Sequence, residues 1–240
     1  MANLWIDTEV VENRLEIFFR NNKSQIQNFG STVNQTFEAF VFASVLNWYI
    51  SNGWSVDIRN PVSNPKEVKL KFNTRGKPGG YSYAICEKNN EKIQVRHGLR
   101  VSTFYNKPGF TFPANVVLDV AVIYDRDLSQ LKSNDYVDNT DLITFGEAKH
   151  MSAFAELIAN FLGLVHEMKP DAMLPFSPNN FKNFPDHPVP FLYVSGYLYP
   201  TAKGIFESIK DRSINIDIFD HESGVFFGIS LPLRQPKKNP

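Results

Sequence analysis

The chain has 240 residues, a formal net charge of zero at neutral pH, and 42% hydrophobic and 21% charged residues. The composition is ordinary for a globular protein, and the length allows one sizeable core, so we expect one α/β domain rather than two. No apolar run approaches the ~18 residues of a membrane-spanning helix, and the single cysteine, Cys86, excludes an internal disulfide and a cysteine-rich zinc site. The first residues lack the features of a signal peptide, so we expect a protein of the reducing cytoplasm.

Hydrophobic periodicity predicts the elements of the first half of the chain. In chain order these are a helix at residues 8–20, a helix at 34–50, a strand at 54–59, a turn at 61–65, and a hairpin of strands 81–87 and 92–102. The second half is predicted to contain strands at 115–124 and 142–149 joined by the polar loop 125–141, a helix at 152–168, a proline-rich loop at 170–188, a strand at 191–198, a helix at 201–210, and strands at 214–219 and 224–231.

We interpret residues 1–240 as one domain. Residues 1–30 would form an N-terminal helical extension, 32–168 the core, 189–231 peripheral strands and a helix, and 232–240 a disordered tail.

Positive charge is concentrated between Lys66 and Lys107, where ten lysines and arginines stand against three acids. The remainder of this neutral chain therefore carries an excess of acidic residues. Such a segment either puts positive potential on one face of the protein or is a solvated hairpin that keeps the chain soluble.

Asp119 is the only polar residue in the apolar run 116–122. Side chains alternate across a strand, so Asp119 shares a face with Val117 and Ala121. A carboxylate among apolar neighbours is costly unless it is paired or binds a cation. The alternative is an aspartate at a strand end that reaches solvent or a nearby arginine.

The strand predicted at 142–149 ends in Glu147-Ala148-Lys149. Glu147 and Lys149 are two residues apart and point to the same face of a strand. The carboxylate and the carbonyl of Ala148 could bind a hard cation such as Mg²⁺, while the lysine could orient or deprotonate a water. A surface Glu/Lys pair is the alternative, because Glu-X-Lys alone is a weak signal.

A second Glu-X-Lys, Glu67-Val68-Lys69, lies in a run with charges at alternate positions. That pattern is typical of an exposed edge strand, where lysines discourage pairing with other chains. The apolar context of Glu147 and Lys149 favours the later copy as the functional one.

Glu38 is the only charged residue of the predicted helix at 34–50. A lone glutamate in an apolar helix is either an acid favoured by the first helical turn or a ligand for a metal or water in a site.

The order of these elements resembles that of the PD-(D/E)XK superfamily of restriction-endonuclease-like nucleases. It is a helix with the lone Glu38, a strand with Leu118-Asp119, a strand with Glu147-Ala148-Lys149, and then a helix. The chain resembles this superfamily over roughly residues 32–168, with leucine at position 118 where the name residue of the family is proline. The resemblance implies an α/β fold with a restriction-endonuclease-like core. Its central mixed β-sheet would be flanked by helices, with an added β-hairpin and C-terminal strands.

The resemblance also implies a catalytic centre made of Glu38, Asp119, Glu147 and Lys149. Asp119, Glu147 and the Ala148 carbonyl would hold one or two Mg²⁺ ions, with Mn²⁺ as a substitute and Glu38 as an outer or additional ligand. Lys149 would position and activate the attacking water, and the metal would stabilise charge on the phosphate and the leaving oxygen.

Within the basic segment we expect phosphate contacts from Lys77, Lys92, Arg96 and Arg100. The expected partner is nucleic acid, most simply DNA. A DNA endonuclease of restriction or antiviral-defence type would act as a homodimer or as a subunit of a larger defence complex.

Two further classes of function compete with this interpretation. One is a catalytically inactive nuclease-like fold that binds nucleic acid or protein, and the other is an unrelated α/β domain. The intact Asp, Glu and Lys argue against the inactive fold, because unused buried charges would cost stability.

Other polar residues have weaker signals. His150 follows the motif directly and lies beside the metal or caps the next helix, and Glu156 faces the site or pairs with a neighbour. His97, His166 and His221 have no partner spacing and are predicted to be structural.

Overall fold

A computed structural model describes residues 7–21, 25–26, 33–59, 69–70, 73, 75–175 and 186–221. Its elements in chain order are α1 (Thr8–Asn21), β1 (Gln25–Ile26), α2 (Val33–Ser51), β2 (Ser55–Arg59), β3 (Lys69–Leu70), β4 (Tyr83–Lys88), β5 (Glu91–Ser102), β6 (Asn115–Tyr124), η1 (Asn139–Asp141), β7 (Leu142–Lys149), α3 (Ala155–Met168), η2 (Pro170–Met173), β8 (Phe191–Val194), α4 (Pro200–Asp211) and β9 (Asp217–Phe219). The predicted turn at 61–65, strand at 224–231 and tail at 232–240 lie outside the described residues.

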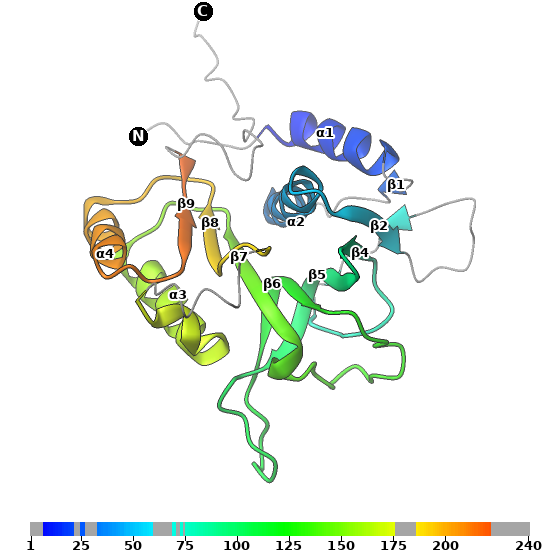
Figure 1. Ribbon diagram of the computed structural model, residues 1–240. Helices are drawn as coiled ribbons and strands as arrows, with labels where there is room; N and C mark the ends of the chain where they lie inside the picture. Colours follow the sequence, from blue (N-terminus) through cyan, green and yellow to red (C-terminus); the bar gives the residue numbers. More distant parts are fainter. Residues whose placement is uncertain are drawn as a thin grey trace, which may run out of the picture.

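Seven strands form one mixed sheet in the order β2-β4-β5-β6-β7-β8-β9 (Figure 1). Neighbours from β2 to β7 are antiparallel, and β8 and β9 extend the sheet in parallel. The hairpin predicted as an addition to the core is part of this central sheet. It turns at Asn89 and Asn90, whose φ angles of 51° and 66° suit a two-residue hairpin loop.

Helices cover both faces of the sheet (Figure 1). α1 and α2 pack on one face through a core that includes Phe37, Leu46 and Val120. α3 and α4 pack on the other face through a core that includes Phe145 and Phe161. The expected α/β fold with a mixed sheet flanked by helices is therefore confirmed. No helix in the described part of the chain is long and apolar enough to cross a membrane.

The strand predicted at 214–219 begins only at Asp217. The end of one other predicted strand and the start of one predicted helix moved for a shared reason. The strand predicted at 191–198 ends at Val194, and the helix predicted at 152–168 begins at Ala155. Between these ends, Ala153 and Leu198 form an isolated parallel bridge. The segments that follow β7 and β8 therefore remain extended and paired with each other up to the start of α3 and α4, respectively.

Candidate active site

Strand β6 changes face at Asp119. Val120 belongs to the core under α2, whereas Leu118 belongs to the core under α3, although residues two apart in a regular strand share a face. On β5, Gly98 lies opposite Asp119 and adopts a φ of 61°. The β5–β6 register has partners on both sides of these two residues but none for them. Asp119 therefore lies at a local break in the sheet.

Strands β6 and β7 also separate at this point. Their register ends with Val120 opposite Gly146, so the next opposed residues are Asp119 and Glu147. At this point hydrogen bonds between side chains and backbone take the place of the backbone-to-backbone bonds that join β6 and β7. The Asp119 N–H donates to Glu147 Oε1 at 3.4 Å, and the Ala148 N–H donates to Asp119 Oδ2 at 3.0 Å. Each carboxylate is thus held by the backbone of the neighbouring strand.

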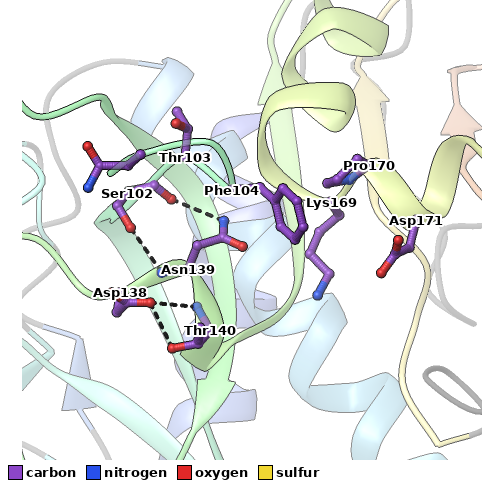
Figure 2. Close-up of a pocket in the computed structure, with 10 residues that line it drawn as sticks. Ser102, Thr103, Phe104, Asp138, Asn139, Thr140, Lys169, Pro170 and Asp171 are labelled. Atoms are coloured by element: carbon purple, nitrogen blue, oxygen red, sulfur yellow. Dashed lines mark hydrogen bonds between the residues drawn. The ribbon is translucent and has the colours of Figure 1, made fainter. Parts of the chain in front are cut away.

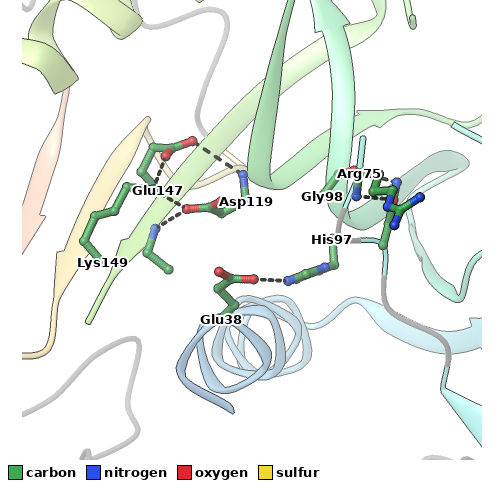
Figure 3. Close-up of polar contacts among 9 residues, drawn as sticks. Glu38, Arg75, His97, Gly98, Asp119, Glu147 and Lys149 are labelled. Carbon is green, nitrogen blue, oxygen red and sulfur yellow. Dashed lines mark hydrogen bonds and ion pairs between the residues drawn. The ribbon is translucent and has the colours of Figure 1, made fainter. Parts of the chain in front are cut away.

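Lys149 joins these two acids in what we call the Asp–Glu–Lys cluster (Asp119, Glu147 and Lys149; Figure 3). Its Nζ donates to Asp119 Oδ2 at 2.8 Å and to Glu147 Oε2 at 2.7 Å. The Glu147 side chain is 11% exposed and that of Lys149 is 36% exposed. The cluster is therefore buried on the glutamate side and open to solvent on the lysine side.

Two carboxylates and one ammonium leave the cluster with excess negative charge. Burial, followed by the charge of Asp119, raises the pKa of Glu147 to about 7 against the opposing effect of Lys149. Burial lowers the pKa of Lys149, but the two carboxylates outweigh it and raise this pKa above its ordinary value. At neutral pH Lys149 is a cation that can orient an anionic oxygen or a water, and Glu147 is the group that can exchange a proton.

Glu38 lies on α2 and contacts β5. Its Oε2 is 3.0 Å from Nε2 of His97, whose side chain is only 4% exposed. Figure 3 shows this pair beside the Asp–Glu–Lys cluster, on the α2 side of Asp119. Sequence spacing gave His97 no partner, because the two residues are separated by 59 positions and meet only through helix-to-sheet packing.

The donor set of the cluster suits a hard cation. Carboxylate and carbonyl oxygens are the ligands that Mg²⁺ prefers, and Asp119 and Glu147 already converge on one cationic nitrogen. Among the residues placed by the structure, no group of three or more His, Cys, Asp or Glu side chains could hold a metal ion. Glu38 contacts His97, so its role as a ligand stays a prediction that requires a different side-chain position.

Two of the predicted phosphate contacts, Lys77 and Arg100, lie on the β5 side of the cluster. The Arg100 guanidinium donates to the carbonyl oxygens of Arg75 and Ser133 at 3.2 and 3.4 Å. Lys77 lies on the same loop as Arg75 and is half-buried. Both side chains can reach solvent, so phosphate contact by them stays a prediction.

The other two predicted contacts, Arg96 and Lys92, also bind protein groups. Arg96 is buried, and its guanidinium donates to the Gln94 side chain at 2.7 Å and to the Pro78 carbonyl at 3.1 Å. Lys92 pairs with Glu87 at 3.2 Å and also with Asp125. A phosphate contact by either residue would require these bonds to break.

Arg75, one of the basic residues between Lys66 and Lys107, is exposed near the site, and no sequence pattern distinguishes it from the others. Asn73 fixes its loop, because Asn73 Nδ2 donates to the Gly98 carbonyl at 2.6 Å and Oδ1 accepts from the Arg75 N–H at 3.0 Å. A Cβ on Gly98 would collide with the Asn73 carbonyl. Figure 3 shows Arg75 beyond His97, on the side away from Lys149.

His150 does not cap α3. Its Nδ1 lies 2.7 Å from Ser195 Oγ, and the N-cap of α3 is Phe154, which makes no side-chain cap bond. The helix-cap alternative is therefore wrong. Glu156 is exposed on the first turn of α3. Of the second Glu-X-Lys, Glu67 and Val68 lie outside the described residues, and Lys69 belongs to the small β1–β3 sheet.

A cavity of about 350 Å³ lies near the C-terminal end of α3 (Figure 2). Lys169, in its wall, donates to the Leu142 carbonyl at 3.0 Å, and burial lowers the pKa of this lysine. Leu142 and Lys149 begin and end β7, so about 23 Å of strand separates them. None of the predicted site residues lines this cavity, which is therefore separate from the Asp–Glu–Lys cluster.

Comparisons of the chain with protein-family models, with curated proteins and with solved structures found no match. The geometry of the Asp–Glu–Lys cluster and its place in the sheet are therefore the features from which a function can be inferred.

Proposed function

We propose that the protein is a metal-dependent nuclease with a PD-(D/E)XK-type centre on a restriction-endonuclease-like core, most simply a DNA endonuclease of restriction or defence type. One observation carries the proposal. Carboxylates from two neighbouring strands, and a lysine two residues beyond one of them, converge where the strands separate. The position of Glu38 on the helix packed against that point and the helix that follows Lys149 also support it.

Asp119, Glu147 and the Ala148 carbonyl would hold the metal. Bound Mg²⁺ would act as a Lewis acid toward a phosphate oxygen and lower the pKa of a bound water. The backbone N–H groups of Asp119 and Ala148 fix both carboxylates before substrate arrives, which preorganises the centre. Glu147 must lose its proton to bind a cation, and with a pKa of about 7 it does so near neutral pH.

Lys149 would position the attacking water and offset charge on the phosphate. Its raised pKa keeps it protonated, so it orients an oxygen through its N–H groups and does not act as the base in this arrangement. Phosphates flanking the cleaved bond would contact the cations on the β5 side, Arg75, Lys77 and Arg100.

The proposal is tested by incubating the protein with plasmid, single-stranded DNA and RNA, in Mg²⁺ and in EDTA. Wild type is compared with Lys149→Ala and Glu147→Gln. Lys88→Ala is a matched control, because Lys88 also pairs with a carboxylate, that of Asp186, but lies at the end of β4 next to the hairpin turn. We expect cleavage that requires Mg²⁺, survives in the control and is lost in both cluster variants. Equal cleavage by wild type and the cluster variants would contradict the proposal.

A nuclease-like fold that binds nucleic acid without cleaving it is the second candidate. One observation favours it: the three acids that would hold a metal already have partners within the protein. The Lys149 ammonium contacts the carboxylates of Asp119 and Glu147, and Glu38 contacts His97. Binding without cleavage of any of the three substrates, in Mg²⁺ or Mn²⁺, would support this candidate over the enzyme.

A further inference from the structure

A group of large apolar and aromatic side chains begins two residues after Lys149. We define the aromatic platform as Met151, Phe154, Tyr197 and Tyr199. Met151, Phe154 and Tyr197 are 46%, 50% and 38% exposed. The Phe154 and Tyr199 rings stack with centroids 4.5 Å apart and an interplanar angle of 15°. Four large side chains, three of them exposed, thus follow the ends of β7 and β8.

Backbone hydrogen bonds hold the platform to the end of β7. The Met151 N–H donates to the Lys149 carbonyl at 2.9 Å. The Ala153 N–H donates to the Tyr197 carbonyl at 2.8 Å, and the Tyr199 N–H donates to the Ala153 carbonyl at 3.0 Å. Phe154 is five residues from Lys149, so their Cα atoms are at most about 17 Å apart. The backbone of the platform is therefore fixed, and its distance from the cluster is one that a few nucleotides of a bound strand would span.

The chemistry of the two flanks of the cluster differs. The segments 150–154 and 195–199, which carry the platform, contain no acidic residue, and the nearest one along the chain is the exposed Glu156 on the first turn of α3. The other flank carries the cations Arg75, Lys77 and Arg100, of which Arg75 lies on the side of the cluster away from Lys149 (Figure 3). A single nucleic-acid strand has the matching division, with charged phosphates and apolar base faces. In a duplex, by contrast, the base faces are covered by their neighbours.

We propose that the aromatic platform stacks the unpaired bases of a single-stranded nucleic acid whose backbone crosses the Asp–Glu–Lys cluster. The inference rests on the proposed function for the position of the backbone and adds the substrate form, an unpaired strand. Every base has a π face, so an exposed aromatic surface binds single strands with little sequence preference. An apolar patch beside a charged site is also where binding surfaces are expected on a folded protein.

The test measures binding in EDTA, so that no substrate is consumed. Fluorescein-labelled 12-nucleotide oligo(dT), oligo(U) and a 12-base-pair duplex are titrated with protein, and anisotropy is recorded. Phe154→Ala and Tyr199→Ala remove the ring stack, while Phe154→Tyr keeps an aromatic ring. Phe104→Ala is the matched control, because Phe104 is 52% exposed and its N–H donates to the backbone carbonyl of Glu167 at the other end of α3, about 20 Å from Phe154.

We expect wild type to bind at least one single strand more tightly than the duplex. Phe154→Ala and Tyr199→Ala should weaken single-strand binding by at least about fivefold, while Phe154→Tyr and Phe104→Ala bind like wild type. The inference is overturned if the platform variants bind single strands like wild type or if the duplex is preferred. The same variants are also compared by sedimentation and by binding to anionic vesicles. A change in the sedimentation coefficient alone would identify an interface between copies of the chain, and a change in vesicle binding alone would identify a membrane-binding surface. Either result would overturn the inference.

The two proposals fail in different ways. Platform-dependent binding of single strands with no cleavage in Mg²⁺ or Mn²⁺ would retain the platform and remove the nuclease. Mg²⁺-dependent cleavage that is unchanged by Phe154→Ala and Tyr199→Ala would retain the nuclease and remove the platform.

Discussion

Two acid–base groupings lie next to each other in this protein, and they differ in their balance of charge. The Asp–Glu–Lys cluster places one ammonium between two carboxylates at a break between β6 and β7. The Glu38–His97 pair, between α2 and β5, places one carboxylate against one imidazole. Both are built from a residue that the sequence marks as a lone acid in an apolar element, Asp119 in one case and Glu38 in the other.

The different balance of carboxylates and basic groups suggests that the cluster and the Glu38–His97 pair have different roles. In the cluster the second carboxylate has no cation of its own, and burial with this neighbour raises the pKa of Glu147 to about 7. Such an arrangement costs stability in the free protein and favours a further cation. In the Glu38–His97 pair, one carboxylate faces one imidazole. We therefore expect the cluster to bind metal and the pair to position α2 against the site.

The largest expected effect is on the cleavage rate, which should fall further in variants of the cluster than in variants of the Glu38–His97 pair. Lys149→Ala and Glu147→Gln should lower the rate of Mg²⁺-dependent cleavage by about 10²- to 10⁴-fold, because they remove groups at the reacting phosphate. Glu38→Gln and His97→Ala should lower it by about 10- to 100-fold, as residues that support a metal centre from outside do. Single-turnover rates measure this. Equal losses in Glu38→Gln and Lys149→Ala would place Glu38 inside the catalytic centre.

The pH dependence of stability provides the next test, without metal. The folded pKa of Glu147 is raised from its ordinary 4.5 to about 7. Its contribution to stability is therefore fully present below pH ~4.5 and is lost as pH rises through ~7. Relative to Glu147→Gln, the free energy of unfolding of wild type should fall by about 3 kcal/mol over this range. Urea denaturation at several pH values in EDTA measures it, and parallel curves for the two proteins would contradict the burial of an ionisable Glu147.

Stabilisation by metal should depend on the cluster and not on the pair. At a Mg²⁺ concentration of about 100 times Kd, binding to the folded state should add about 2.7 kcal/mol to the free energy of unfolding. Asp119→Asn should abolish the accompanying rise in Tm, and Glu38→Gln should retain it. A rise that is lost in Glu38→Gln and kept in Asp119→Asn would reverse the two assignments.

The smallest expected effect concerns the cations on the β5 side. Arg75→Ala should reduce the slope of log affinity against log salt for single strands by about 0.7, the value for one lost phosphate contact. Arg59→Ala is the matched control, because Arg59 is also exposed but lies on the edge strand β2 and pairs with Asp57. Anisotropy titrations at several salt concentrations measure both slopes. An unchanged slope for Arg75→Ala would remove Arg75 from the phosphate path.

The sequence predicted the strands of the site well for a physical reason. β6 and β7 are covered by helices on both faces, so they are nearly continuous apolar runs whose ends are sharp. Their predicted bounds, 115–124 and 142–149, match the structure. The same apolar background made Asp119 and Glu147 visible as exceptions. The convergence of Asp119, Glu147 and Lys149 was expected only from the resemblance. Strand alternation placed Asp119 on one face with Val117 and Ala121, which is wrong because β6 changes face at Asp119.

The sequence could not predict contacts made by packing between distant segments. Arg96 alternates with apolar residues along β5 as a solvent-facing residue does, yet the loop that contains Pro78 covers it and accepts its hydrogen bond. His97 meets Glu38 only because α2 packs on β5. The break at Gly98 depends on the approach of Asn73, which no periodicity encodes. These contacts decide which basic residues remain accessible to a phosphate.

A crystal of the protein soaked in Mn²⁺ tests the metal centre most directly, through an anomalous difference map recorded at the manganese edge. We expect a peak between the carboxylates of Asp119 and Glu147, with the Lys149 side chain moved from its present bonds, and no such peak in crystals of Asp119→Asn. A map with no peak at the cluster, or with a peak only elsewhere on the protein, would contradict the proposal that this cluster is a metal-dependent catalytic centre.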